Sequence, residues 1–335
     1  MESDDRLQYS YNRILDITAA IGIPIKLLSM YLIIFKSPRS MRHTSYFILN
    51  EVSWNCAGNL LFAFGHPLPL MPALCFRMDG LFGYLPTNDE QRKIFFMAAL
   101  LTVVNCAIGL MTTFQFRYMT LAFKNTISNI HPAWGYVYCI TLHLIGSAAL
   151  CYLLYEWRMP TENYSKHDLP NDLSNIFCYS PDGAIINIFY WVLTLSVVFV
   201  ITLIIVFSLL CTYELKKQKR YIQPRTLAIQ RLLLRNLVIM TTVPIVQGGL
   251  PLLGAIFFIY NSELPYAKVI VTGCIMMILN YGTVYGILMM YLFKSYRRAV
   301  HQMCRLLLKP MGKCGEIVSP VHTSLNAITP RIVKF

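Results

Sequence analysis

Charged residues are scarce in this chain. Only 13% of its 335 residues are Asp, Glu, Lys or Arg, about half the share that is usual in soluble proteins. Apolar residues make up 56%, and the mean hydropathy is +0.51. The length alone would suggest two soluble domains, but this composition excludes them. The sequence is that of an integral membrane protein.

The chain also lacks the motifs on which most enzymes depend. Its seven His residues show no H-E-x-x-H motif and no paired metal-ligand spacing, and its ten Cys residues include no C-x-x-C. It has no Walker loop and no G-x-S-x-G, and no two acids stand together within an apolar run. We therefore expect no enzymatic activity, no bound metal and no cofactor.

The net charge of +13 does not indicate a nucleic-acid partner, because the positive residues are not gathered into one patch. Lys and Arg instead concentrate in alternate segments between apolar runs, near 36–42, 117–124, 216–235 and 294–334. This distribution predicts a membrane face that contacts anionic lipid and acidic partner surfaces.

Long apolar runs are what the chain has in abundance. The plainest is 94–116, which holds no charged residue and stops at Arg117-Tyr118. A bilayer-spanning helix needs about 20 such residues. We predict seven spans, at 14–35, 46–70, 93–117, 133–155, 183–212, 234–260 and 266–293. The prolines between 64 and 74 are interpreted as a span leaving the membrane rather than as a strand.

The predicted fold is an all-α membrane protein, a seven-transmembrane-helix receptor bundle. Residues 1–13 would form an extracellular N-terminus, 14–293 the bundle, and 294–335 a cytoplasmic amphipathic helix and tail. Apolar residues recur along one side of 294–309 and Arg residues along the other, as in helices that lie on a membrane surface. The positive-inside rule places the N-terminus of this multi-pass cell-membrane protein outside.

The predicted outer face carries two features. Cys75 and Cys178 are its only cysteines outside the spans, and a disulfide between them is chemically allowed there because the outer face is oxidising. Two free thiols are the alternative. Asn163-Tyr164-Ser165 is an N-glycosylation acceptor in the longest outer loop.

Few polar residues fall within the predicted spans. Glu51, Asn55 and Asn59 recur every four residues and so share one face of the second helix. A carboxylate within a bilayer is a functional candidate by default. The alternatives are that Glu51 reaches headgroup water and that the two Asn side chains hold helices together. Lys26 stands near the middle of the first span and must face the bundle or snorkel, and Asn105 is expected to hydrogen-bond between helices.

The sixth and seventh spans contain helix-shaping residues. Pro244 and Pro251, with Gly248-Gly249 between them, predict a bend in the sixth span, which makes that span a candidate moving part. Gly282 and Gly286 form a small-xxx-small pair, which we expect to serve packing.

Several short motifs, in order and across about 14–300, resemble those of nematode serpentine chemoreceptors of the Str superfamily, in its class H or the related class I. They are Ser37-Pro38 with Met41; Leu49-Asn50, Trp54 and Asn59-Leu60; the run from His66 to Pro72 with Gly80; Gln115 to Tyr118; Thr226, Gln230, Pro244 and Pro251; Gly282; and Ser295-Tyr296-Arg297. The chain departs from the family in having Gln115 and Asn59 where an acid is usual and Ser295 where proline is usual.

The resemblance implies a G-protein-coupled receptor for environmental chemicals, an olfactory type of receptor carried on sensory neuron cilia. A small molecule would bind between the outer halves of spans three, five, six and seven. The G protein would then be contacted at Arg117, Tyr118 and Gln115 and at Tyr296 and Arg297. Under this interpretation Arg117 is a coupling residue rather than a snorkelling anchor. The alternative is a ligand-gated channel or transporter with Lys26 and Glu51 lining a path, against which stand the odd number of spans and the absence of an inverted repeat.

Overall fold

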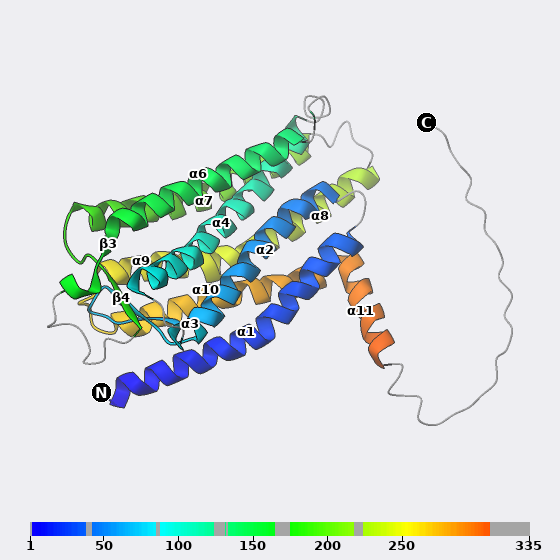
Figure 1. Cartoon of the computed structure of the whole chain (residues 1–335). Coiled ribbons are helices and arrows are strands. Elements are labelled where there is room, and N and C mark those ends of the chain that lie inside the picture. Colours follow the sequence, from blue (N-terminus) through cyan, green and yellow to red (C-terminus); the bar gives the residue numbers. More distant parts are fainter. Residues whose placement is uncertain are drawn as a thin grey trace, which may run out of the picture.

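The computed structural model describes residues 2–37, 42–84, 88–123, 131, 133–164, 175–217 and 224–308. Long helices run side by side along one bundle (Figure 1). They are α1 (Glu2–Lys36), α2 (Arg42–Gly65), α4 (Asp89–Ala122), α6 (Ala133–Trp157), α7 (Ala184–Lys217), α8 (Pro224–Val243) with α9 (Leu250–Tyr260), and α10 (Ala267–Leu292). A π-helical turn, η5 (Pro244–Gly249), joins α8 to α9.

Within the described ranges, six helices are long and apolar enough to cross a membrane, counting α8 to α9 as one. The remaining long helix, α2, is less apolar because it carries Asn50, Glu51, Asn55 and Asn59. It nevertheless packs along both α1 and α4 as a member of the bundle. The protein is therefore a multi-pass membrane protein built as a bundle of long helices.

Several helices extend beyond the apolar runs that predicted them, the first and the third among them. The first begins at Glu2, so most of the segment predicted as the extracellular N-terminus is helical. The third, α4, continues to Ala122, so Arg117 lies within the helix rather than at its end. Both helices continue past their apolar runs because the polar residues there also adopt a helical backbone conformation.

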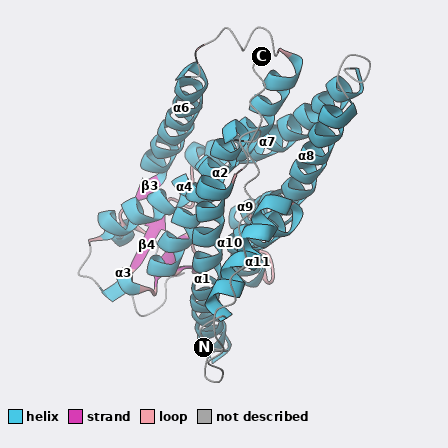
Figure 2. Ribbon diagram, turned by 90° about the vertical axis from the view of Figure 1, so that its right-hand side faces the viewer, coloured by secondary structure: helices cyan, strands magenta, loops and turns pink. Residues whose placement is uncertain are grey.

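A small antiparallel sheet lies at the end of the bundle where Figure 1 labels β3 and β4. Its strands are magenta in Figure 2. Its order is β1 (Pro67–Pro69), β2 (Cys75–Met78), β4 (Ile176–Tyr179) and β3 (Arg158–Met159). The prediction that the proline-rich segment contains no strand was therefore wrong. Prolines lack the N–H that a central strand needs, but β1 lies at the sheet edge, where they are tolerated. The short helix α3 (Leu81–Tyr84) follows β2 in the chain, and the 3-10 turn η2 (Thr161–Asn163) follows β3.

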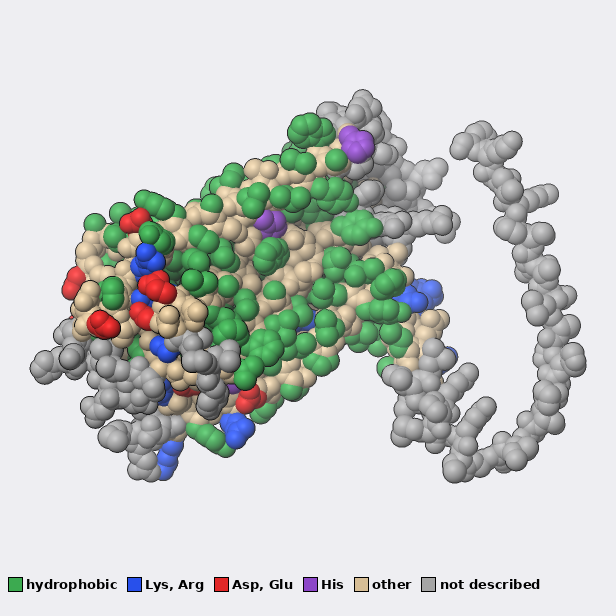
Figure 3. Space-filling model, in the orientation of Figure 1, with side chains coloured by type: hydrophobic (Ala, Val, Ile, Leu, Met, Phe, Trp, Pro, Cys, Tyr) green, Lys and Arg blue, Asp and Glu red, His purple; other side chains and the backbone are tan. Residues whose placement is uncertain are grey.

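The amphipathic helix α11 (Lys294–Leu308) crosses the opposite end of the bundle (Figure 1). We call the two ends the sheet end and the α11 end. Tyr296 and Ala299 pack into a core cluster with residues of α1, α2, α8 and α10, which fixes α11 to the bundle. Figure 3 shows hydrophobic side chains over the middle of the bundle and the Asp and Glu side chains of that face in the half nearer the sheet.

Candidate functional site

A cavity of about 120 Å³ lies within the bundle near the sheet end. We call it the outer cavity. Most of its walls come from α4, α7, α9 and α10, which belong to the third, fifth, sixth and seventh long helices of the bundle. The rest come from α2, α6, β1 and β2. The lining contains no charged or amide side chain and includes Phe96, Trp157, Phe189, Ala255 and Leu279.

The sheet forms the roof of the outer cavity. Phe76 of β2 lines it directly and lies 4.5 Å from Phe96 between ring centroids. Trp157 stacks on Phe189 at 4.4 Å and on Tyr179 of β4 at 4.6 Å. Burial raises the pKa of Tyr179 well above its usual range, so its hydroxyl stays neutral. The roof is thus a packed aromatic cluster rather than a loose loop.

Two polar atoms beside this apolar lining already have partners. The Trp157 indole donates to the Ser180 carbonyl at 2.9 Å. The Tyr260 hydroxyl donates to the Asn187 side chain at 2.6 Å. A molecule in the outer cavity would therefore meet hydrocarbon almost everywhere, which favours apolar occupants.

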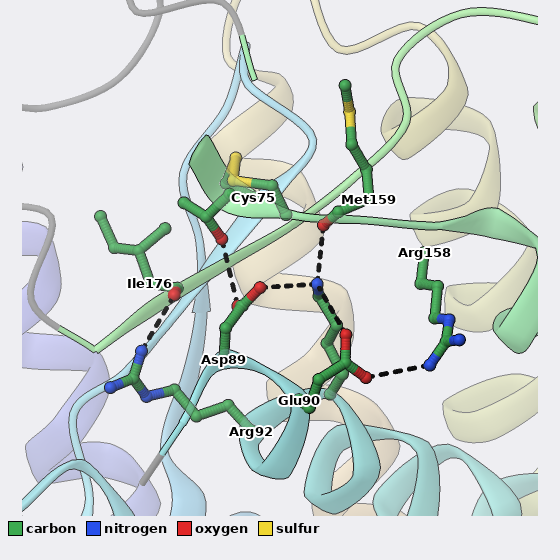
Figure 4. Close-up of polar contacts among 10 residues, drawn as sticks. Cys75, Asp89, Glu90, Arg92, Arg158, Met159 and Ile176 are labelled. Carbon is green, nitrogen blue, oxygen red and sulfur yellow. Dashed lines mark hydrogen bonds and ion pairs between the residues drawn. A yellow bond between two sulfur atoms is a disulfide. The ribbon is translucent and has the colours of Figure 1, made fainter. Parts of the chain in front are cut away.

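Ion pairs and hydrogen bonds fasten the roof to the start of α4 (Figure 4). Lys93, which is 5% exposed, donates to Asp89 at 2.7 Å and to the Met159 carbonyl of β3 at 2.6 Å. Arg158 pairs with Glu90 at 3.0 Å. Buried charge is tolerated here because every member is paired.

Two further contacts complete the roof. Arg92 donates to the Ile176 carbonyl of β4 at 3.1 Å. Cys75 and Cys178 form a disulfide that joins β2 to β4 with a Cα–Cα distance of 4.1 Å. This is the disulfide that the sequence allowed, and not the alternative of two free thiols. Asn163 is exposed beside them in η2.

A buried polar chain begins below the outer cavity. The Tyr281 hydroxyl and the Cys106 thiol lie 2.6 Å apart, and the thiol donates to the Glu51 backbone carbonyl at 3.5 Å. The Glu51 carboxylate accepts a hydrogen bond from Tyr285 at 2.9 Å. Tyr285 belongs to the core cluster that also holds Tyr296 of α11. The chain of contacts thus leads from the cavity toward the α11 end.

Glu51 is only 2% exposed, so the interpretation that it reaches headgroup water was wrong. Its buried position follows from the rotation of α2, which turns this face toward α4 and α10. The same rotation places the Asn55 side chain beside Cys106 and Tyr281. Asn105 of α4 donates to Ser147 of α6 at 2.9 Å, which is an interhelical hydrogen bond of the expected kind.

The sixth long helix, formed by α8, η5 and α9, changes its helical geometry beside this buried polar chain. The N–H of Leu250 donates to the carbonyl of Ile245 within the π-helical turn. Pro244 begins that turn, and Pro251 stands in the first turn of α9. Proline lacks a donor N–H and clashes with the preceding turn, so a wider turn here has an identifiable cause. Gly248 faces the Tyr281 ring, which would lie 3.4 Å from an added Cβ, an ordinary van der Waals distance.

The residues predicted for G-protein coupling do not form one cluster, because each contacts a different part of the bundle. Gln115 donates to Tyr138 of α6 at 2.7 Å. Tyr118 packs with Leu121 and with leucines of α7 and α8. Tyr296 is 1% exposed and bonds to Ser37 at 2.7 Å, so direct contact with a partner at Tyr296 is excluded in this conformation. The reason is that the apolar side of α11 faces the bundle.

Arg117 and Arg297 occupy opposite environments. Arg117 is 9% exposed, lies near Cys211 of α7, and in the described part of the chain its Nε and Nη2 have no hydrogen-bond partner. It is therefore not a snorkelling side chain at the lipid surface. Arg297 is exposed and lies over the Tyr291 ring, 6.0 Å from its centroid.

Sequence reasoning missed Cys106, Tyr281 and Tyr285. Cys in an apolar run behaves as a small hydrophobe, and neither Tyr281 nor Tyr285 belongs to a recognisable motif. Spacing offered one signal, because Tyr281 and Tyr285 lie four residues apart and so share a helix face.

Comparison with known families identifies the bundle. The model of the family described as "Serpentine type 7TM GPCR chemoreceptor Srh" matches residues 7–306. This range contains the sheet, the outer cavity and all of the helices except the start of α1 and the end of α11. No curated protein matches the chain. Chemoreceptors of this type are receptors rather than enzymes. The chain belongs to the Srh family of serpentine seven-transmembrane chemoreceptors.

Proposed function

We propose that this protein is a G-protein-coupled chemosensory receptor whose ligand is a small apolar molecule bound in the outer cavity. The observation that carries the proposal is the lining of that cavity, which is apolar, roofed by aromatic side chains and free of charge. Its volume of about 120 Å³ is close to that of cavities of about 150 Å³ that take up benzene.

The size of the cavity bounds the affinity. Small ligands gain at most about 1.5 kcal/mol per non-hydrogen atom. A ligand of about six atoms therefore reaches at most about 9 kcal/mol, which corresponds to a dissociation constant near the micromolar range. We expect responses at micromolar concentrations of ligand.

The polar chain below the cavity gives a route for the signal. Ile278 and Leu279 line the cavity just before Tyr281 on α10, and Leu252 lines it just after η5. A ligand that packs differently against these side chains in two arrangements shifts the equilibrium between them. Motion of α9 against α10 would alter the contact of Gly248 with Tyr281 and hence the Tyr281–Cys106 hydrogen bond.

We place the sheet end outside the cell and the α11 end in the cytoplasm. Support comes from the disulfide, which needs an oxidising compartment, and from the Lys and Arg concentrated in the predicted inner segments. In this orientation Asn163 is available for glycosylation. Arg117, Tyr118 and the exposed Arg297 lie toward the end that would meet a heterotrimeric G protein. A sensory cilium membrane is the location that fits such a receptor.

The test is a calcium assay in cells that supply a promiscuous G protein. Toluene, indane and cyclohexane are compared with the charged analogues benzylammonium and benzoate. We expect responses to apolar compounds only. Ala255→Leu should abolish them, because Ala255 is 4% exposed and lines the cavity. Ala149→Leu makes the same change at an exposed position on α6 and should leave the response intact.

Two results would overturn the proposal. Responses to benzoate without responses to toluene would contradict an apolar site, and equal responses from the Ala255 and Ala149 variants would place the ligand elsewhere. A response that survives when G-protein coupling is blocked would favour a ligand-gated channel instead.

A further inference from the structure

Lys26 is a buried cation in the middle of the bundle. Its side chain is 1% exposed, although α1 carries it within a long apolar stretch. Within the described part of the chain, its Nζ has no hydrogen-bond partner. The ionisable side chains that face it are the thiols of Cys56 on α2 and Cys106 on α4. The Glu51 carboxylate instead accepts from Tyr285.

Two other buried polar groups converge on the same place. A Cβ built on Gly22 of α1 would lie 2.7 Å from the Thr283 hydroxyl, 3.5 Å from Asn59 Nδ2 and 3.9 Å from Lys26 Nζ. These atoms come from α10, α2 and α1. Asn59 is 4% exposed and Thr283 is 9% exposed. Neither of the two atoms has a hydrogen-bond partner among the described residues.

All three groups offer hydrogens. A lysine ammonium carries three N–H donors, an Asn amide two and a Thr hydroxyl one. A buried charge is costly unless it is paired. Water would supply hydrogen-bond partners but would not neutralise the ammonium, whereas an anion does both. All three side chains are at most 9% exposed, which limits the occupant to a small ion.

We propose that Lys26, Asn59 and Thr283 bind a small monovalent anion, with chloride as the abundant candidate, where α1, α2 and α10 meet. The anion would be the counter-ion of Lys26 and would bridge the three helices. This site is separate from the outer cavity and does not depend on the identity of the chemosensory ligand.

The test measures thermal unfolding of the full chain, purified in detergent. A thiol-reactive dye reports unfolding, because buried free cysteines such as Cys56 and Cys211 become exposed. Sodium chloride replaces sodium gluconate at constant ionic strength, since gluconate is too large for the site. A ligand that binds only the folded state raises the unfolding midpoint with the logarithm of its concentration. We expect a rise of roughly 3 °C for each tenfold increase above the dissociation constant, and the same rise with bromide.

Two variants assign the effect to the site. Lys26→Met removes the charge, and Asn59→Asp supplies a carboxylate next to the ammonium, so both should lose the dependence on chloride. Asn59→Asp also keeps the test valid if Lys26→Met does not fold. Lys217→Met, at an exposed position on α7, should keep the full dependence.

A wild-type midpoint that is the same in chloride and gluconate would overturn the proposal and would mean that Lys26 is neutral or hydrated. Full chloride dependence in Asn59→Asp or in Lys26→Met would place the anion elsewhere and would overturn it equally.

Discussion

Gly282 of α10 lies against α2, and the space beside it is already filled. A Cβ added there would overlap the Asn55 side-chain amide. That amide cannot move away freely, because Asn55 contacts both Cys106 and Tyr281. Gly282→Ala therefore forces either a change of the Asn55 rotamer or a wider separation between α2 and α10. Overpacking of this kind costs about 1–3 kcal/mol, partly offset by the gain of about 1 kcal/mol in helix propensity.

Gly273 on the same helix provides the control. A Cβ added at Gly273 meets nothing within 4 Å, so Gly273→Ala should keep only the propensity gain of up to about 1 kcal/mol. The two variants should therefore differ by about 2 kcal/mol, or roughly 5 °C in the midpoint of thermal unfolding. Gly282→Ala should be the less stable one.

The assay is the thiol-dye unfolding curve in detergent, together with the level of each variant at the cell surface. The double variant Gly282→Ala with Asn55→Ala tests the cause, because removal of the amide makes room for the new methyl group. We expect the double variant to recover part of the loss seen in Gly282→Ala. Equal midpoints for Gly282→Ala and Gly273→Ala, or no recovery in the double variant, would refute the reasoning.

Three further predictions concern the two ends of the bundle. Arg117→Lys keeps the charge but loses the planar guanidinium, so it should reach the surface at near wild-type level and lose most G-protein activation; normal signalling would make Arg117 a structural cation only. Tyr296→Phe removes the hydrogen bond to Ser37, worth about 1 kcal/mol, and should speed hydrogen exchange in α11, while unchanged exchange would contradict that contact. Cys75→Ser and Cys178→Ser should each lower surface expression with no further loss in the double variant, whereas additive losses would contradict the disulfide.

The long helices could be predicted because each rests on a continuous apolar run. Residues 94–116 alone satisfy the length that a bilayer requires, and the observed α4 contains them. The ends of the helices could not be predicted equally well, because polar residues such as Asp89 and Arg117 fit a helix but carry no hydropathy signal.

The sheet and the polar chain depended on information that one sequence does not display. Strands as short as β1, with prolines at both ends, have neither the length nor the alternation that marks a strand. The pairing of Tyr281 with Cys106 depends on how α4 and α10 rotate about their axes, and an apolar run does not fix rotation. The same limit applies to Tyr296, whose spacing marks one side of α11 but not what that side packs against.

The π-helical turn η5 makes the outer cavity depend on chain length as well as on side-chain identity. A π turn contains one residue more than an α turn, and one residue corresponds to about 100° of rotation around a helix. Without that residue, Leu252, Ala255 and Ile256 would turn away from the cavity while α9 kept the same sequence. Insertions and deletions near Pro244 would therefore alter ligand preference as effectively as substitutions in the lining, and a comparison of the lining residues alone would overlook them.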